Sequence, residues 1–192
     1  MHSVARVLRR RLAARRQVER QASSAVAFDV DGVLIRGGAT VAAAPGALQS
    51  LQAAHIPFLF MTNGGGHFEE ARAAQFSDKF GVPVSEWQIC QSHTPMRALA
   101  ERHGDEMVLL VGKRYGNLEK IAASYGFNHF VTVEELHRAY PLLYPDAPPE
   151  PAGPDARSAS ALDLDRPFGA VLALTDPLLW GRELQICCDV LR

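Results

Sequence analysis

The segment SAVAFDVDGVLIRG, residues 24–37, decides the fold. It begins with the apolar run Ser24–Phe28, which is typical of a buried strand, and passes into the turn-like DVDG at 29–32. A second apolar run, Ile56–Met61, stops just as abruptly at TNGGG, residues 62–66. Apolar strands that alternate with helical segments predict an α/β fold with a largely parallel, helix-covered sheet, of the Rossmann-like kind.

The rest of the chain continues this alternation. Helical spacing predicts helices over Pro45–Ala54, Phe68–Phe80, Thr94–Arg102, Asn117–Tyr125, Glu134–Ala139 and Trp180–Arg192. Further strands are expected at Gln88–Cys90, Met107–Val111, Phe130–Thr132 and Gly169–Leu174. Residues Tyr144–Pro167 are rich in Pro, Ala, Ser and Asp, and they predict a long surface loop or insertion.

Charge is distributed unevenly along the 192 residues. Residues 1–20 hold seven Arg and one Glu, a local charge of +6, so the remaining chain carries −7 to reach the total of −1. A mildly acidic body argues against a nucleic-acid-binding surface. The basic, amphipathic N-terminus resembles a mitochondrial transit peptide. The alternatives are a frayed, solvated helix or spurious sequence from a loose gene model, and the alternative location is cytoplasmic. No apolar run approaches the ~20 residues that span a bilayer.

Cysteines and histidines give no metal or disulfide signature. Cys187 and Cys188 lie in an apolar helical stretch, and we expect buried thiols there. The seven histidines show no HxH or HExxH spacing, and His55, His103 and His137 are expected on helix surfaces. Gly112-Lys113 lacks the spacing of a phosphate-binding P-loop.

Polar side chains follow the first and second apolar strands at their carboxyl ends, where open α/β sheets bind ligands. Asp29 could attack phosphorus while Asp31 protonates the leaving oxygen and later activates water. Two carboxylates facing a phosphate call for a hard cation, and Mg²⁺ suits these oxygen ligands. Gly32, Thr62 and Asn63 offer amide and hydroxyl donors. Asp-x-Asp-Gly after a strand is also a common turn, so this motif alone does not establish a site. A second apolar strand that ends in Thr-Asn strengthens the functional interpretation.

Taken together, FDVDGVLIRG resembles motif I of the haloacid dehalogenase (HAD) superfamily, and FMTNGGG resembles its motif II in the NagD-like subgroup IIA. The segments Gln88–Glu101, Val108–Phe127 and Gly169–Arg192 are similar to later segments of that subgroup. The similarity, over residues 26–192, is strongest to the haloacid dehalogenase-like hydrolase domain-containing protein 5 family, also called the cat eye syndrome critical region protein 5 family.

This resemblance implies a division of the chain and a set of roles. Residues 1–22 would be a basic presequence, 23–103 the first part of the HAD core, and 104–192 an incomplete C2-type α/β cap with the insertion 144–167. Asp29 would be the nucleophile and Asp31 the general acid/base. Mg²⁺ would be held by the Asp29 carboxylate and the Asp31 backbone carbonyl, while Thr62, with Asn63 beside it, would bind the phosphoryl group. The expected partner is a small phosphorylated substrate, and a homodimer through the cap is possible.

Two later motifs of the superfamily find no match here. None of the three lysines, Lys79, Lys113 and Lys120, has a motif III context. For the acidic motif IV, Asp163 and Asp165 follow no apolar strand, and Asp176 matches a cap position. We therefore expect a C-terminally truncated isoform, a fragment or an incomplete gene model, with impaired catalysis. The alternative is a catalytically inactive product with at most a binding role.

Overall fold

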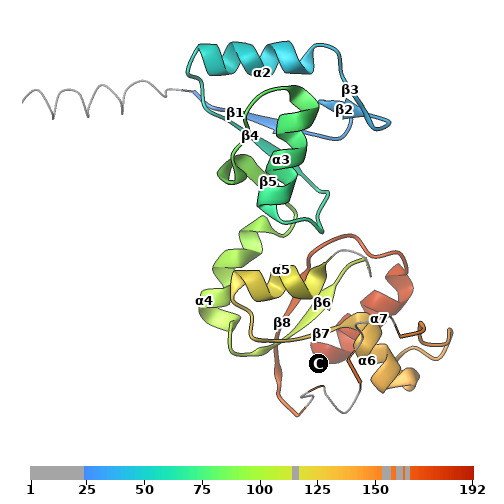
Figure 1. Cartoon of the computed structure of the whole chain (residues 1–192). Helices are drawn as coiled ribbons and strands as arrows, with labels where there is room; N and C mark the ends of the chain where they lie inside the picture. Colours follow the sequence, from blue (N-terminus) through green and yellow to red (C-terminus); the bar gives the residue numbers. More distant parts are fainter. Residues whose placement is uncertain (1–23, 114–116, 153–156, 159–161, 163–164) are drawn as a thin grey trace, which may run out of the picture. The chain divides into compact units, whose positions relative to one another are not determined.

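A computed structural model describes residues 24–113, 117–152, 157–158, 162 and 165–192 (Figure 1). The chain forms two compact units. The first unit runs up to Met61 and also includes Ala73–Gln88, and the second consists of Thr62–Arg72 and Ile89–Arg192. The expected presequence, 1–22, lies outside the described residues. The assignment of 23–103 to a core and 104–192 to a cap stays a prediction.

In the first unit, strands β1 (Val26–Asp29) and β4 (Phe58–Thr62) pair in parallel. Their register places Val26 opposite Phe58 and Asp29 opposite Met61. Helix α2 (Ala44–Ala53) joins the two strands, and α3 (Glu69–Phe80) follows β4. Because the two strands are parallel and α2 connects them, their carboxyl ends meet at one edge.

Aromatic side chains hold α3 against β4. The Phe60 ring stacks on Phe80 at a centroid distance of 5.8 Å and lies 5.1 Å from the ring of Phe76. These three rings are all almost completely buried. Their burial fixes the path of β4 within the first unit.

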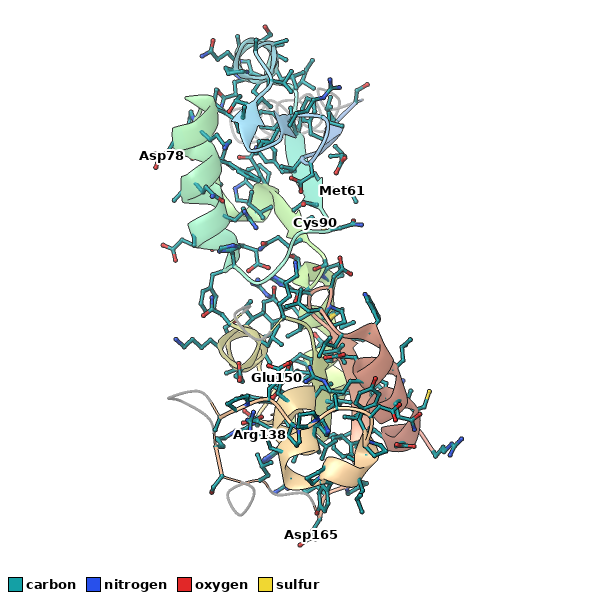
Figure 2. The ribbon with its side chains drawn as sticks, turned by 90° about the vertical axis from the view of Figure 1, so that its right-hand side faces the viewer. Met61, Asp78, Cys90, Arg138, Glu150 and Asp165 are labelled. Atoms are coloured by element: carbon teal, nitrogen blue, oxygen red, sulfur yellow. The ribbon has the colours of Figure 1, made fainter. Side chains whose placement is uncertain are left out.

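The opposite side of β1 and β4 is more open than the apolar runs predict. Burial alternates along β4, with Phe58 and Phe60 buried and Met61 49% exposed, and Ala27 on β1 is exposed as well. Figure 2 labels Met61 at the end of β4. The prediction of buried strands therefore holds for only one face of this pair. Alternation of this kind is the pattern of a sheet covered on one face.

The second unit is built on a parallel sheet with strand order β7-β6-β8, formed by His129–Thr132, Met107–Val111 and Phe168–Ala173. Successive residues of β6 face opposite clusters. Val108 and Leu110 pack with α5 (Leu118–Tyr125), whereas Met107 and Leu109 pack with α6 (Val133–Ala139) and α7 (Trp180–Val190). Figure 1 shows these helices around the sheet. All five residues of β6 are buried, as its uninterrupted apolar run predicts.

Most predicted elements are confirmed within two residues at each end. The predicted helix Thr94–Arg102 is instead a 3₁₀ turn, η2 (Thr94–Leu99), that continues as the short helix α4 (Ala100–His103). Strand β5 (Ile89–Gln91) lies just before it. The structure adds the two-stranded hairpin β2 (Ile35–Arg36) and β3 (Ala39–Thr40), and the short 3₁₀ turns η1 (Glu86–Gln88) and η3 (Pro141–Leu143).

The Pro-rich insertion carries no helix or strand over its described residues, as predicted. Ion pairs hold it to the rest of the second unit. Glu150, labelled in Figure 2, accepts from Arg182 Nη1 at 2.9 Å. Arg157 Nη2 lies 2.6 Å from Glu135 Oε2, and the Arg157 guanidinium stacks over the Phe130 ring. His137, expected on a helix surface, is fully buried because the insertion covers it and the Tyr144 carbonyl lies 3.1 Å from its Nε2.

Among the described residues no helix is long and apolar enough to cross a membrane. All three cysteines are free. Cys187 is partly buried and Cys188 is exposed, so the expectation of two buried thiols is wrong for Cys188.

Candidate active site

Asp29 and Asp31 flank a buried valine at the carboxyl end of β1. Asp29 is the last residue of the strand, and both carboxyl-bearing residues are exposed. Val30 between them is only 3% exposed. Since alternate residues of an extended chain point to opposite sides, the buried Val30 anchors the turn while both carboxylates face solvent. The first unit thus presents two accessible acidic side chains next to each other.

A tight turn follows the two aspartates. The Leu34 and Ile35 N–H groups both donate to the Val30 carbonyl, at 3.0 and 2.9 Å. Gly32 adopts φ +88°, a backbone angle that residues with a side chain rarely adopt, so glycine is needed here. The Gly32 N–H donates to the Ile35 carbonyl at 2.7 Å. This donor, expected for phosphate, therefore already has a partner within the turn.

The β2–β3 hairpin extends this turn, and the sequence analysis missed it. Gly37 and Gly38 form its two-residue loop with φ of +55° and +83°. Two consecutive positive-φ residues characterise the type I′ turn, and Gly-Gly between short β-prone pairs is a sequence signal that could have found it. Two basic side chains bind the hairpin region: Arg36 Nε donates to the Gly32 carbonyl at 2.9 Å, and Lys79 Nζ donates to the Gly38 carbonyl at 2.7 Å.

Thr62 and Asn63 begin the second unit, directly after Met61, the residue paired with Asp29. Thr62 is buried, and its Oγ1 accepts from the Gly64 N–H at 3.0 Å, which makes a hydroxyl-capped turn. Asn63 is exposed. The structure thus brings Asp29, Asp31 and Gly32 together in the first unit. The expected convergence of Thr62 and Asn63 on them stays a prediction.

The glycine loop, residues 64–66, is tightly held within the second unit. A Cβ at Gly65 would lie 2.6 Å from both the Leu174 carbonyl oxygen and Ser92 Oγ, so only glycine fits. Asn117 Nδ2 donates to the Gly66 carbonyl at 3.3 Å. Just beyond the loop, Gln91 Nε2 donates to the His67 carbonyl at 2.8 Å. The loop after Thr62 therefore has a fixed path.

A buried polar network lies against this loop. Tyr125 donates its hydroxyl proton to Glu69 Oε1, and Thr94 Oγ1 donates to the same oxygen at 2.8 Å. His93 Nδ1 lies 2.7 Å from the Tyr125 oxygen. Because the phenol proton points to Glu69, the imidazole must be the donor, which assigns the Nδ1–H tautomer. The other ring nitrogen of His93 is buried, and within the described part of the chain no group hydrogen-bonds to it.

Burial shifts the ionisation of these groups. Burial lowers the pKa of the His93 imidazole, and the nearby Glu69 charge opposes this shift only in part. Burial, the hydrogen bond to Glu69 and the charge of Glu69 all raise the pKa of the Tyr125 phenol. For Glu69, burial acts to raise the pKa, but hydrogen bonds from Tyr125 and Thr94 outweigh it and the pKa is lowered. The network therefore contains an anionic Glu69 beside a neutral His93.

The remaining candidate residues, Lys113, Asp163, Asp165 and Asp176, belong to the second unit. Lys113 follows β6, and its backbone N–H donates to Thr175 Oγ1 at 2.8 Å. Asp165 sits in a turn, where Figure 2 shows it pointing away from the second unit, and Asp163 lies outside the described residues. Asp176 is exposed after β8. Over residues 24–192, apart from the undescribed gaps, no three His, Cys, Asp or Glu side chains gather as a metal site.

Comparisons with known proteins identify the family of the chain. The model of a family described as haloacid dehalogenase-like hydrolase matches residues 26–128, more than half of the chain. A cardiolipin synthase (CMP-forming) / mitochondrial hydrolase fusion protein of Schizosaccharomyces pombe is 37% identical over 166 residues, which cover 85% of this chain and 27% of that protein. A mitochondrial hydrolase of Saccharomyces cerevisiae is 36% identical over 168 residues, which cover 87% of this chain and 47% of that protein.

The chain thus spans about half, or less, of the length of these curated relatives. A solved structure of a possible sugar phosphatase of the HAD superfamily, from Cytophaga hutchinsonii, superposes with a TM-score of 0.57 at 16% identity. That superposition covers 88% of this chain and 50% of the other, and it supports the α/β fold. The family match includes β1, the turn with both aspartates, and β4. The chain belongs to the haloacid dehalogenase-like hydrolase family.

Proposed function

We propose that the site at the end of β1 serves a Mg²⁺-dependent phosphatase of the NagD-like subgroup, similar to the haloacid dehalogenase-like hydrolase domain-containing protein 5 family. Its substrate would be a small phosphate ester. The observation that carries this proposal is the pair of exposed carboxylates, Asp29 and Asp31, on either side of buried Val30. This pair lies inside the segment that matches the hydrolase family.

The two carboxylates divide the chemistry. An Asp29 oxygen attacks phosphorus, and the bond from phosphorus to the ester oxygen breaks as the Asp31 carboxyl gives its proton to that oxygen. The product is an alcohol and an aspartyl-phosphate on Asp29. Asp31, now a carboxylate, takes a proton from water as the water oxygen attacks phosphorus. The bond to Asp29 breaks, inorganic phosphate leaves, and both carboxyl groups return to their starting states.

The donor set fits a magnesium ion. Mg²⁺ is commonly held by one or two carboxylates together with waters and substrate phosphate, so a cluster of three acidic residues is not needed. The Asp29 carboxylate and the Asp31 backbone carbonyl are the oxygen ligands we assign to it. When bound, Mg²⁺ supplies positive charge that offsets the repulsion between the carboxylates and the phosphate.

Phosphate contacts are assigned to Thr62, Asn63 and Gly32. The support for Thr62 is its place in the sequence as the last residue of β4, directly after Met61, which pairs with Asp29. Asn63 is exposed and available to a ligand. The Gly32 N–H would share its hydrogen bond to Ile35 with a phosphate oxygen.

The place of action and the assembly are also proposals. Both curated relatives have "mitochondrial hydrolase" in their names, which supports a mitochondrial rather than cytoplasmic location. A homodimer through the second unit is supported by exposed apolar side chains on and near α7, among them Leu178, Trp180, Leu184 and Leu191. Neither nucleic acid nor a membrane span is part of this proposal.

A second candidate function is an inactive, binding-only product. It is favoured by the lysines: none of Lys79, Lys113 and Lys120 has a motif III sequence context, and Lys79 binds the Gly38 carbonyl. The site then lacks the cationic donor of motif III, and loss of one preorganised donor costs about 10²–10³ in rate. Sequence beyond Arg192 that contains such a lysine and an acidic pair would favour the enzyme for the longer protein.

The test is Mg²⁺-dependent hydrolysis of p-nitrophenyl phosphate by the 192-residue chain, with Asp29→Asn and Asp31→Asn as variants. The phosphatase proposal expects turnover that requires Mg²⁺ and is lost in Asp29→Asn. Equal rates for the wild type and Asp29→Asn, both folded by circular dichroism, would reject catalysis by this chain and favour the inactive product.

A further inference from the structure

The described part of the first unit holds few positive charges. Its described residues, 24–61 and 73–88, contain four carboxylates but only two cations among lysine and arginine, Arg36 and Lys79. Two of the carboxylates are Asp29 and Asp31. A phosphate dianion that approaches this pair meets like charge, so any basic side chain of this unit near the pair has a large effect on binding.

Both cations attach to the segment that directly follows the aspartates. Arg36 Nε donates to the Gly32 carbonyl at 2.9 Å, which places the guanidinium beside the residue after Asp31. A bridge between Asp31 and Ile35 brings the start of β2 back alongside Asp31. Lys79 reaches from α3 and donates to the Gly38 carbonyl at 2.7 Å, across the loop of the hairpin. The two lysine and arginine side chains in the described part of the first unit thus both bind carbonyls within residues 32–38.

Arg36 and Lys79 differ in the shape of their donor groups. The ammonium of Lys79 bonds to a carbonyl of the hairpin loop, and this contact fixes the hairpin to α3. Arg36 is exposed, and its contact to Gly32 uses one of five guanidinium N–H groups. The planar guanidinium matches two phosphate oxygens at once, and such charge-assisted pairs are short and strong.

We propose that Arg36 is a phosphate-binding residue of this site and that Lys79 is a positioning residue that holds the β2–β3 hairpin. The hairpin thereby supplies positive charge beside Asp29 and Asp31. This inference rests on the proposed function for the place of the phosphate, and it adds the residue that pairs with it. A purely structural Arg36 would instead brace the turn through Gly32 alone.

The test measures binding of inorganic phosphate, in the presence of Mg²⁺, to the whole 192-residue chain by isothermal titration calorimetry. Arg36→Gln removes the charge, Arg36→Lys keeps it without the planar fork, and Arg102→Gln removes an equal charge from an exposed position of α4 in the second unit. We expect Arg36→Gln to weaken binding about 10- to 100-fold, the loss of a charge-assisted hydrogen bond. Arg36→Lys should lie between, and Arg102→Gln should match the wild type.

Thermal unfolding separates binding from folding. A lower midpoint for Arg36→Gln with unchanged phosphate affinity would show a brace and overturn the inference, and so would a wild-type chain that binds no phosphate. If Arg36→Gln does not fold, the affinity of folded Arg36→Lys decides: a drop supports the inference and wild-type affinity overturns it. If turnover is lost in Asp29→Asn but phosphate affinity is unchanged in Arg36→Gln, this inference is rejected and the phosphatase proposal stands. If phosphate affinity falls in Arg36→Gln but the wild type and Asp29→Asn have equal turnover, the phosphatase proposal is rejected and this inference stands.

Discussion

The Nδ1 nitrogen of His93 lies 2.7 Å from the phenol oxygen of Tyr125, and the same phenol donates to the carboxylate of Glu69. His93 is fully buried, and its ring edge faces Gly65, where an added Cβ would come within 2.9 Å of His93 Cδ2. A chain of three polar side chains thus lies directly behind the glycine loop that follows Thr62. Buried polar groups in such a chain stabilise a structure only while every partner is present.

Removal of the Tyr125 hydroxyl should therefore be costly. In Tyr125→Phe, Glu69 loses one donor and His93 Nδ1 loses its only acceptor among the described residues, and an unsatisfied buried group costs about 1–3 kcal/mol. Urea denaturation of the whole chain would measure the free energy of unfolding. Tyr140→Phe is the matched control, since Tyr140 is 52% exposed and should change stability little. Equal changes in the free energy of unfolding for Tyr125→Phe and Tyr140→Phe would contradict a stabilising role of the Tyr125 hydroxyl.

The same network predicts a dependence of stability on pH. Because burial lowers the pKa of folded His93 below the ordinary 6.5, the unfolded chain takes up a proton first as the pH falls. The free energy of unfolding should drop below about pH 6.5, and His93→Gln should flatten this drop. The groups around His93 are Glu69, Tyr125, Arg72 and His67. His67, whose pKa burial also lowers, has the same sign, so His67→Gln is measured alongside. An unchanged slope in His93→Gln would show that His93 has the same pKa in the folded and unfolded chains, which would contradict the prediction.

Two glycine-to-alanine substitutions should change the stability of the chain in opposite directions. In Gly65→Ala the new methyl would lie 2.6 Å from the Leu174 carbonyl oxygen, and overpacking of this kind costs about 1–3 kcal/mol. Gly46 lies inside α2 with nothing within 4 Å of an added Cβ, so Gly46→Ala should stabilise by about 0.5–1 kcal/mol. Thermal unfolding midpoints of both variants check this pair. A neutral Gly65→Ala would mean that the loop after Thr62 is not clamped.

Arg182 is predicted to be essential for the stability of the second unit. Its guanidinium contacts Glu183 at 2.5 Å, Glu134 at 3.1 Å and Glu150 at 2.9 Å, and burial raises the pKa of the Glu134 carboxyl. Arg182→Met leaves buried carboxylates without a cation, which costs about 3–5 kcal/mol. Removal of a second charge in Arg182→Met/Glu183→Met should restore part of the loss. Denaturant titration of the three proteins measures this, and a double variant less stable than Arg182→Met would contradict it.

Local sequence patterns were sufficient for the elements that carry the two aspartates. The apolar runs before Asp29 and Thr62 predicted β1 and β4, and the buried run Met107–Val111 predicted β6 to the residue. In each case the periodicity of a few consecutive residues carries the information. The hairpin at residues 35–40 was missed because its strands have two residues each, too short for any period. Its Gly-Gly loop was the signal that remained.

Contacts between distant residues were beyond the sequence. Glu69, His93 and Tyr125 are separated by 24 and 32 positions, and nothing local marks them as partners. His137 lies in a helix whose pattern indicated an exposed side chain, yet the insertion buries it through Tyr144. Exposure of Ala27 and Met61 also escaped prediction, since a run of apolar residues does not say which face of a sheet is covered.

The most direct test of the central claim is to look for a phosphoryl group on Asp29. The chain and its Asp31→Asn variant are mixed with Mg²⁺ and p-nitrophenyl phosphate, quenched in acid, digested and analysed by mass spectrometry. We predict a phosphorylated peptide that contains Asp29, more abundant in Asp31→Asn because hydrolysis of the aspartyl-phosphate is slowed, and absent from Asp29→Asn. An aryl phosphate that this chain hydrolyses without any phosphoryl group on Asp29, even in Asp31→Asn, would contradict Asp29 as the nucleophile.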